Sequence, residues 1–555
     1  MTIDVLGWIS ANQQHYTLVS GAAIFAFAGL AAASAFVDDP AGRRAHPAAF
    51  AFFLGLGLLA IVAGRWPTFF VQDPLNPDEA QMLAQAITAL HDPVPWRSFD
   101  GTTSGPLNTY VLALPALLGQ HLTFFGARVV AVLLEFGAIA CLYACCARLF
   151  GTTVARLGTV APVAFFALVT QDDFNHYSSE QLSIFLGMVA LALLVLAYDR
   201  RFAPWPVFAT GAVTGALPFA KLQSVPLAAA TAAVAVVAIV ASCGGSSRTA
   251  LRRLAIFAGG LATVPVLIVG VVAAGGALRD FWISYVEMGR AYVLTTNEPL
   301  SFLTAMPGFG WAFDALAAVA LAGAVVAAVR WKALPVEARA AFVGALLVLA
   351  GGVVAVYAPK RASPHYLLFA LMPAASCAAA ALGILAAAFG ARALRVAALP
   401  VALAALAAQS AFARPPYPYL YALWDYRRGP HDPVTALLKR YLQPGDRLAI
   451  WGWRPKYFVD TDTLLGTRDS ITPYQESPNF NPYFDYYRER YMTDLAANKP
   501  KGFLDAGPDS FDFTGKGGDG HEMFPQLAVA VAHDYRYVGS AGYFRFYVRR
   551  DAAGS

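Results

Sequence analysis

The stretch QDDFNHYSSEQLSIFLGMVALALLVLAYDRR, residues Gln171–Arg201, decides the fold class. Residues 179–198 within it form an apolar run, and a helix needs about 20 such residues to cross the hydrocarbon core of a membrane. Acidic residues precede the run, and Arg200 and Arg201 follow it. Because loops rich in Lys and Arg stay in the cytoplasm, the pattern predicts a transmembrane helix that begins on the outer side.

The composition of the whole chain agrees with a membrane protein. Of 555 residues, 58% are hydrophobic and only 14% are charged, whereas soluble proteins carry about 25% charged residues. The first apolar run resembles a signal peptide, but nothing positive precedes it, and we expect it to be retained. About twelve transmembrane helices are predicted, near residues 16–37, 48–66, 128–148, 153–170, 179–198, 205–220, 222–242, 250–274, 309–330, 338–357, 366–389 and 395–412.

Basic residues orient these helices, because they fall in alternate loops. They are Arg43-Arg44, Arg148 with Arg156, Arg200-Arg201, Arg248 with Arg252-Arg253, Arg330 with Lys332 and Arg339, and Arg392 with Arg395. One threading places all of these loops in the cytoplasm and both termini outside. A further apolar segment, residues 107–118, would invert this threading if it crossed the membrane. We therefore expect it to be an interfacial helix within a long outer loop, residues 67–127.

The composition changes after residue 412, which predicts a transmembrane domain over residues 1–412 and an extracytoplasmic α/β domain over residues 413–555. Turn residues and apolar runs predict the elements of the second domain. Helices are expected at residues 432–442, 483–498 and 525–535, strands at residues 448–453 and 502–505, and a hairpin or strand pair at residues 537–548.

Asp78 and Glu79 are the first candidate catalytic residues. They open an amphipathic helix in the first outer loop, where a carboxylate can act as a general base. Acidic residues in a first helical turn also cap the helix and complement its dipole. Both explanations stay open for this pair.

A second acidic motif lies in the tight outer loop before the quoted run. Asp172, Asp173 and His176 are residue types that bind sugar hydroxyls or a divalent metal. The alternative is an ordinary solvated turn between two helices. No metal is required by the sequence, although one is possible.

Basic residues on two other outer turns suggest an anionic ligand. Lys221 interrupts a long apolar stretch, and its side chain either snorkels to the lipid headgroups or contacts a phosphate. A second cluster, at an outer loop where basic residues are unexpected, consists of Lys360, Arg361, His365 and Tyr366. An arginine there can hold a phosphate with two hydrogen bonds, although a plain surface loop is the alternative.

Several function classes lack support in the sequence. It contains no phosphate-binding P-loop, dinucleotide fingerprint, HExxH zinc motif or GxSxG nucleophile motif. The five cysteines lie in or beside apolar runs and predict no disulfide framework. Basic residues are spread over the cytoplasmic loops, so no nucleic-acid partner is expected.

In their order along the chain and in the side of the membrane on which they are expected, these motifs resemble the GT-C class of membrane glycosyltransferases. The nearest members are the lipid A aminoarabinose transferases, the protein O-mannosyltransferases and the lipopolysaccharide galacturonosyltransferase-like proteins. Asp78-Glu79 is similar to the acidic motif of their first outer loop, and Gly105-Pro106 through Arg128 to their interfacial helix and arginine. Asp172 or Asp173, Lys221 and His365-Tyr366 match later motifs. Two departures are a second span before the acidic loop and Gly105-Pro106 in place of Lys-Pro-Pro.

The resemblance implies an inverting glycosyltransferase in the bacterial cytoplasmic (inner) membrane. It would move a sugar from a polyprenyl-phosphate donor to a glycan, lipid or protein acceptor. Asp78 would be the base with Glu79 as its partner, and Lys221 and Arg361 would bind the donor phosphate in one pocket facing Asp78, with Lys360 and His365 nearby. The alternative is a transporter or flippase of a lipid or small solute. Glu135 and Asp314 are the charged residues well inside apolar runs, and no internal repeat supports a transporter.

Overall fold

The computed structural model describes residues 12–37, 47–295, 309–361, 363–410, 432–476, 478, 481–507 and 520–551. The chain divides into two compact units. The first comprises Met1–Phe70, Ala131–Val266 and Asn297–Trp424, and the second comprises Val71–Val130, Leu267–Thr296 and Asp425–Ser555. The second unit thus combines the C-terminal residues with two earlier segments. The predicted division at residue 412 stays a prediction.

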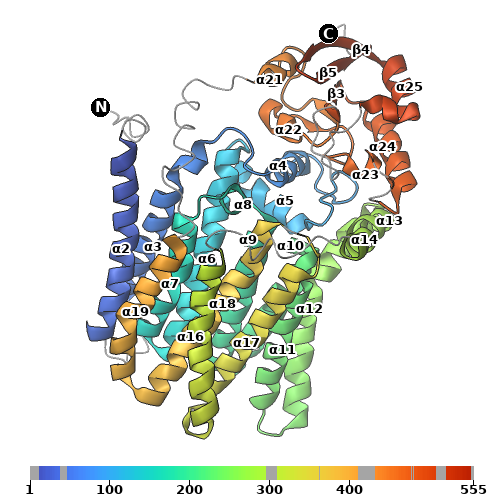
Figure 1. Ribbon diagram of the computed structural model, residues 1–555. Coiled ribbons are helices and arrows are strands. Elements are labelled where there is room, and N and C mark those ends of the chain that lie inside the picture. Colours follow the sequence, from blue (N-terminus) through green and yellow to red (C-terminus); the bar gives the residue numbers. More distant parts are fainter. Residues whose placement is uncertain are drawn as a thin grey trace. The chain divides into compact units, whose positions relative to one another are not determined.

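Long apolar helices make up most of the first unit (Figure 1). α18 is its central helix, since most of its residues are buried by neighbouring helices. Helices α6 and α12 begin or end in the second unit. The long helices are α2 (Gln13–Val37), α3 (Pro47–Arg65), α6 (Phe124–Phe150), α7 (Thr152–Leu168), α9 (Ser179–Asp199), α10 (Pro204–Ala220), α11 (Val225–Ala241), α12 (Ser247–Ala274), α16 (Phe309–Arg330), α17 (Val336–Tyr357), α18 (Leu368–Phe389) and α19 (Ala391–Ser410).

These helices coincide with the predicted transmembrane runs. Nine helices among the described residues are long and apolar enough to cross a membrane. The other predicted runs correspond to α7 and α10, of 17 residues each, and to α19, which carries Arg392 and Arg395. The prediction of a polytopic α-helical membrane protein with a small C-terminal α/β domain is confirmed.

Short helices connect the long ones in this unit. They are η1 (Trp66–Phe70), α8 (Asp172–Asn175), η3 (Leu222–Ser224), η5 (Trp331–Ala333) and η6 (Pro364–Leu367). Gln181, in the first turn of α9, accepts a hydrogen bond at 2.9 Å from the backbone N–H of Ser178, the residue before the helix. This contact helps to fix the residue at which the preceding loop becomes the long apolar helix α9.

The second unit contains a mixed sheet and shorter helices. The helices are α4 (Pro77–Ala89), α5 (Pro106–Ala113), η2 (Leu114–Leu118), α13 (Leu278–Phe281), the π-helical η4 (Trp282–Glu287), α14 (Met288–Thr295), α21 (Pro433–Leu438), α22 (Lys456–Thr461), α23 (Pro473–Glu476), α24 (Phe484–Asn498), η8 (His521–Met523) and α25 (Pro525–Asp534). The strands are β1 (Arg447–Trp451), β2 (Leu464–Leu465), β3 (Gly502–Asp505), β4 (Tyr535–Ala541) and β5 (Phe544–Arg549).

The five strands are ordered β2-β1-β3-β5-β4. β1 runs parallel to β2 and β3, with Leu448 beside Gly502, and β5 runs antiparallel to β3 and β4. Alternate residues of β1 face opposite sides. Leu448 and Ile450 pack in the core that includes α21 and α22, whereas Ala449 and Trp451 pack in the core that includes α24 and α25. The predicted strands, helices and terminal hairpin of this domain are confirmed, and Figure 1 shows the sheet between its helices.

The segment expected to lie at the membrane surface forms α5 and η2. Together they cover Pro106–Leu118, which is apolar but too short to cross a membrane. Leu117 and Leu118 are largely exposed. Its position at the lipid–water interface stays a prediction.

Candidate functional site

The acidic pair at the start of α4 divides into two different environments. Asn76 caps the helix by accepting a hydrogen bond from the Asp78 backbone N–H at 2.9 Å, and Pro77 occupies its first turn. Glu79 is 0% exposed, whereas Asp78 is only half-buried. Two adjacent residues on a helix point in different directions, and this difference places Glu79 inside the unit and Asp78 at its surface.

Glu79 is held by an arginine from the start of α6. Nε of Arg128 donates to Oε1 of Glu79 at 3.0 Å, and Nη2 donates to Oε2 at 2.8 Å. The same guanidinium donates to the backbone carbonyls of Val71 at 2.6 Å and Asp73 at 2.8 Å. Arg128 therefore ties the start of α6 to the start of α4 and to the residues before it, and the Glu79 carboxylate also accepts from the Leu75 backbone N–H at 3.3 Å.

Asp78, by contrast, keeps its carboxylate available. Among the residues that the structure describes, neither carboxylate oxygen of Asp78 accepts a hydrogen bond or joins an ion pair. A half-buried carboxylate without a partner, on a rigid helix start, can accept a proton from a bound hydroxyl group. The pair thus contains one carboxylate fit for proton transfer and one that fixes the backbone.

In the first unit, the basic residue of the turn after α10 lies in a buried cluster. Lys221 is 4% exposed, and its ammonium group forms an ion pair with Glu180 in the first turn of α9. The same ammonium lies 4.9 Å from the centre of the Tyr366 ring, a cation–π contact. The Lys221 side chain therefore does not snorkel toward lipid headgroups, and that alternative is wrong.

His365 connects this ion pair with the acidic loop before α9. Its Nε2 lies 3.8 Å from Oε1 of Glu180, and its Nδ1 lies 3.7 Å from Oδ2 of Asp173. The ring of His176 packs edge-on against the His365 ring, with 5.6 Å between centroids. Because the two nitrogens of His365 face different carboxylates, these groups do not present three ligand atoms to one point, as a metal site requires.

A second arginine fixes the loop that carries Asp173 and His176. Arg65, at the end of α3, donates from Nε to Asn175 at 2.9 Å and forms a buried ion pair with Glu135. Gln181 donates to Glu135 at 2.8 Å and to the His176 carbonyl at 3.0 Å. Glu135 is thus a structural partner within the helix bundle, and it holds the loop against α9.

The remaining predicted residues are close in sequence to members of this cluster. Asp172 and Lys360 are exposed, and Arg361 is half-buried. The Asp172 carbonyl oxygen lies 3.1 Å from Nδ1 of His176. The backbone of Lys360 has a φ of 51°, a left-handed conformation that marks a tight turn.

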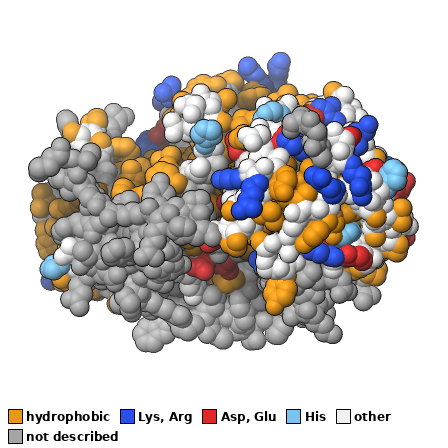
Figure 2. All heavy atoms as spheres, turned by 90° about the horizontal axis from the view of Figure 1, so that it is seen from above, with side chains coloured by type: hydrophobic (Ala, Val, Ile, Leu, Met, Phe, Trp, Pro, Cys, Tyr) orange, Lys and Arg blue, Asp and Glu red, His pale blue; other side chains and the backbone are white. Residues whose placement is uncertain are grey.

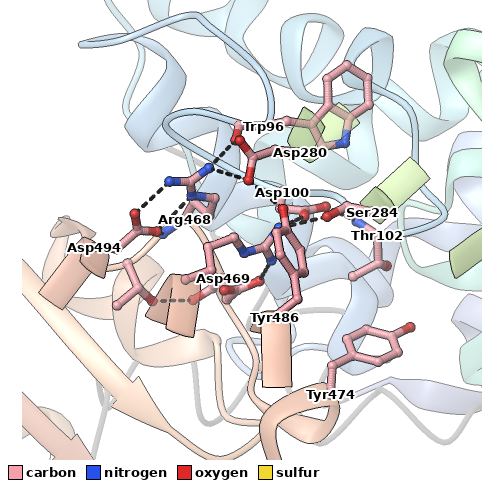
Figure 3. Close-up of polar contacts among 12 residues, drawn as sticks. Trp96, Asp100, Thr102, Asp280, Ser284, Arg468, Asp469, Tyr474, Tyr486 and Asp494 are labelled. Carbon is pink, nitrogen blue, oxygen red and sulfur yellow. Dashed lines mark hydrogen bonds and ion pairs between the residues drawn. The ribbon is translucent and has the colours of Figure 1, made fainter. Parts of the chain in front are cut away.

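A buried ion network in the second unit joins three segments of chain (Figure 3). Nη1 of Arg490 donates to Asp100 at 2.8 Å and to Ser284 of η4 at 2.7 Å, and Nη2 pairs with Asp469. Burial raises the pKa of Asp469 to about 7, and Arg490 opposes this shift while Asp100 adds to it. The network thus connects the segment between α4 and α5, η4 and the C-terminal part of the chain.

A neighbouring arginine extends the network. Arg468 binds Asp494 with two hydrogen bonds of 2.8 and 2.7 Å, and it also donates to the Trp96 carbonyl at 2.7 Å. Its Nη1 lies 3.1 Å from Asp280 in α13. These contacts explain why residues 71–130 and 267–296 belong to the same compact unit as the C-terminal residues.

One set of residues in the described part of the chain has ligand atoms close enough to hold a metal ion. Asp505, His521 and Glu522 place one such atom each within 4.8 Å of one another. Arg545, however, forms ion pairs with both Asp505 and Glu522. Its guanidinium already supplies the positive charge that these carboxylates attract, so we assign this set a structural role.

The described side chains on one face of the molecule are of mixed type. On the coloured part of the face in Figure 2, Lys and Arg side chains are interspersed with acidic and hydrophobic ones. A nucleic-acid interface gathers basic residues on one face. This part of the surface has no such patch.

Comparison with solved structures identifies the fold. ArnT from Cupriavidus metallidurans, solved bound to undecaprenyl phosphate, aligns over 91% of this chain and 99% of its own, with 15% identity and a TM-score of 0.55. Its apo structure matches with 14% identity and the same TM-score of 0.55. ArnT is the lipid A aminoarabinose transferase, a GT-C glycosyltransferase. The chain has the GT-C fold.

Another solved structure is less similar to this chain. The Archaeoglobus fulgidus oligosaccharyltransferase, tethered with an acceptor peptide, aligns over 89% of this chain and 73% of its own, with 15% identity and a TM-score of 0.45. No protein-family model matches the sequence, and no curated protein matches it either. The GT-C fold therefore rests on the agreement with ArnT.

Within the GT-C fold, the structure brings together a subset of the predicted residues. Lys221, His365, Tyr366, Asp173 and His176 form one cluster. Glu180, which links Lys221 with His365, was not predicted as a site residue. Its signal was an acid at the start of an apolar run, because such a residue needs a cationic partner when buried.

Proposed function

We propose that this protein is an inverting glycosyltransferase that moves a sugar from a polyprenyl-phosphate donor to an acceptor hydroxyl on the outer face of the membrane. The observation that carries the proposal is the shared fold with ArnT over nearly the whole of both chains. ArnT was solved with undecaprenyl phosphate, a polyprenyl phosphate of the kind released by such a donor. The acceptor is a glycan, a lipid or a protein.

Asp78 is the general base in this proposal. Its carboxylate takes the proton from the acceptor hydroxyl while that oxygen attacks the anomeric carbon of the sugar. The bond between this carbon and the phosphate oxygen breaks, and polyprenyl phosphate leaves from the opposite face. The unpaired carboxylate of Asp78 supports this role, and the Arg128–Glu79 contact supports Glu79 as the residue that positions it.

Lys221 binds the donor phosphate. An ammonium group has three N–H donors, and Glu180 is the described side chain that accepts from Lys221. At least one donor thus remains for a phosphate oxygen. Cations held in place before the reaction stabilise a leaving phosphate without reorganisation. Arg361 and Lys360, in the turn before His365 and Tyr366, supply further positive charge at the same cluster.

Asp172, Asp173 and His176 bind the acceptor. The contact of Asp173 with His365 supports a position beside the donor phosphate. Among the described residues, these three are not a group whose ligand atoms lie close enough together to hold a metal ion, so we retain acceptor binding as their assignment. Sugar transfer should then persist in the presence of a metal chelator.

The transporter alternative receives less support from the structure. A transporter uses ionisable groups near the middle of the membrane that change partner during transport. Glu135, the buried acid inside an apolar run, is held by Arg65 and Gln181. This fixed arrangement favours a structural role, and it removes the residue that most suggested a transporter.

Catalysis on the outer face requires both termini to lie outside the cytoplasm. The alternating basic loops support this orientation and a location in the bacterial cytoplasmic membrane. A reporter that is active only in the cytoplasm should give no signal when fused after residue 430, and should give signal when fused after Arg201. Signal from the first fusion contradicts outer-face catalysis.

The proposed reaction is tested in cells that lack the protein. A lipid extract from a deletion strain should accumulate a polyprenyl-phosphate sugar, because its consumer is absent. Expression of the wild-type protein should remove the accumulated lipid, whereas expression of the Asp78→Asn variant should not. An unchanged lipid profile in the deletion strain contradicts the proposal.

A further inference from the structure

Two adjoining cavities open among the helices of the first unit, at the ends predicted to face the cytoplasm. The larger has a volume of about 390 Å³, in the range of small-molecule sites. Its lining includes Arg148, Tyr198 and Glu337. The smaller has a volume of about 130 Å³ and is lined almost entirely by apolar side chains. Leu149 and Phe150 line both cavities, so the two cavities lie next to each other.

The larger cavity is lined by one cationic and one anionic side chain that can form further hydrogen bonds. Arg148 donates from Nε to Asp199 at 2.5 Å, and its two terminal nitrogens donate to none of the described residues. One oxygen of Glu337 accepts from the Tyr198 hydroxyl at 3.3 Å. Within the described ranges, no Lys, Arg or His forms an ion pair with Glu337. The cavity therefore offers a guanidinium and a carboxylate to one ligand.

The smaller cavity supplies the complementary apolar space. Helices α6, α9, α11, α17 and α18 surround it. Cys145, Met188, Val234 and Gly344 are among its lining residues. An apolar space of this kind favours a hydrocarbon chain over water, because water needs polar partners to enter a cavity.

We propose that the two cavities bind one zwitterionic phospholipid with a primary ammonium headgroup, such as phosphatidylethanolamine. Its phosphate accepts hydrogen bonds from the terminal nitrogens of Arg148, and its ammonium group pairs with Glu337. One acyl chain enters the apolar cavity. The basic loops at this end of the helices place the lipid in the cytoplasmic leaflet, and the inference does not depend on the proposed sugar transfer.

The charged side chains at the larger cavity favour this headgroup over those of other phospholipids. An anionic phospholipid without an ammonium group would place its headgroup beside the carboxylates of Glu337 and Asp199 with a single arginine to compensate. A choline headgroup carries positive charge but has no N–H to donate to Glu337. A simpler explanation of Glu337, that it complements the dipole in the first turn of α17, predicts no headgroup preference.

The test measures lipids retained by the purified full chain. Native mass spectrometry compares retention of phosphatidylethanolamine, phosphatidylcholine and phosphatidylglycerol with identical acyl chains. We expect about tenfold greater retention of phosphatidylethanolamine than of phosphatidylglycerol, the effect of about one hydrogen bond to a charged group. Glu337→Gln should abolish this preference. Asp314→Asn is the matched control, since Asp314 is an exposed acid on α16 that does not line either cavity.

A second variant tests the proposal even if Glu337→Gln fails to fold. Ala341 lines the apolar cavity, and Ala341→Leu should reduce retention of phosphatidylethanolamine by filling the chain site. Val354→Leu, at an exposed position of the same helix, should have no effect. Equal retention of the three headgroups overturns the proposal, as does retention in Ala341→Leu equal to that in Val354→Leu.

Discussion

The guanidinium of Arg128 binds both oxygens of Glu79, at 3.0 and 2.8 Å, and both side chains are buried. Removing one partner of a buried ion pair leaves an uncompensated charge, at a cost of about 3–5 kcal/mol. We therefore expect Arg128→Met to lower the unfolding temperature of the purified protein markedly. Asp485→Asn, at an exposed acid in the first turn of α24, is the control and should change it little. A variant at Arg128 that is as stable as this control contradicts the structural role of the pair.

Substitution of the neighbouring acid should separate chemistry from stability. Asp78→Asn preserves the shape of the side chain and removes the base, so we expect sugar transfer to fall by about 10²–10⁴-fold. The unfolding temperature should stay near that of the wild-type protein, because the Asp78 carboxylate has no described partner to lose. Near-normal transfer by this variant would reject Asp78 as the base.

The Lys221–Glu180 pair allows a test that distinguishes phosphate binding from folding. Lys221→Met alone leaves the Glu180 carboxylate buried without its cation, and should destabilise the protein. The double variant Lys221→Met with Glu180→Gln removes both charges and should recover much of this stability. If Lys221 binds the donor phosphate, the double variant still needs about tenfold more donor for half-maximal transfer, the effect of about one charge-assisted hydrogen bond. A normal donor requirement in a stable double variant assigns Lys221 a structural role only.

Asp469 should make the stability of the second unit depend on pH. Burial raises its pKa to about 7 in the folded protein, whereas an unfolded Asp has a pKa of about 3.9. The folded state thus holds a proton that the unfolded state has lost, so stability falls as pH rises from about 4 to 7 and then levels off.

Asp469→Asn removes this titration. The variant should gain stability relative to the wild-type protein as the pH is raised from 5 to 8, as measured by unfolding temperatures at each pH. Parallel curves for the two proteins would show that Asp469 does not titrate in this range.

Much of the fold was predictable because membrane insertion imposes strong rules on sequence. Every predicted span coincides with a helix, and residues 502–505 form the strand expected from their sequence. These elements depend on local hydrophobicity and turn residues. By contrast, β2 has only two residues, and it pairs with β1 through contacts that a local pattern does not encode.

The candidate site was predicted less completely, because partners distant in sequence define it. Lys221 and Glu180 are separated by 41 positions, and the sequence left open whether Lys221 faced lipid or protein. Likewise, the sequence suggested Asp78 as the base and Glu79 as its partner, but it did not show that Arg128 binds the Glu79 carboxylate. Residue type and spacing suggested which side chains could accept a proton or bind a phosphate. The ion pairs in the structure show which of these side chains are already bound to another residue.

The most direct test of sugar transfer uses the purified protein in lipid vesicles with the polyprenyl-phosphate sugar isolated from the deletion strain. The donor carries a radiolabel in its sugar, and membranes of the deletion strain supply the acceptor. We predict that label moves from the donor to an acceptor and that unlabelled polyprenyl phosphate is released, with wild-type protein but not with Asp78→Asn. Movement of the intact labelled lipid across the bilayer without transfer of its sugar would contradict the glycosyltransferase assignment and favour a flippase.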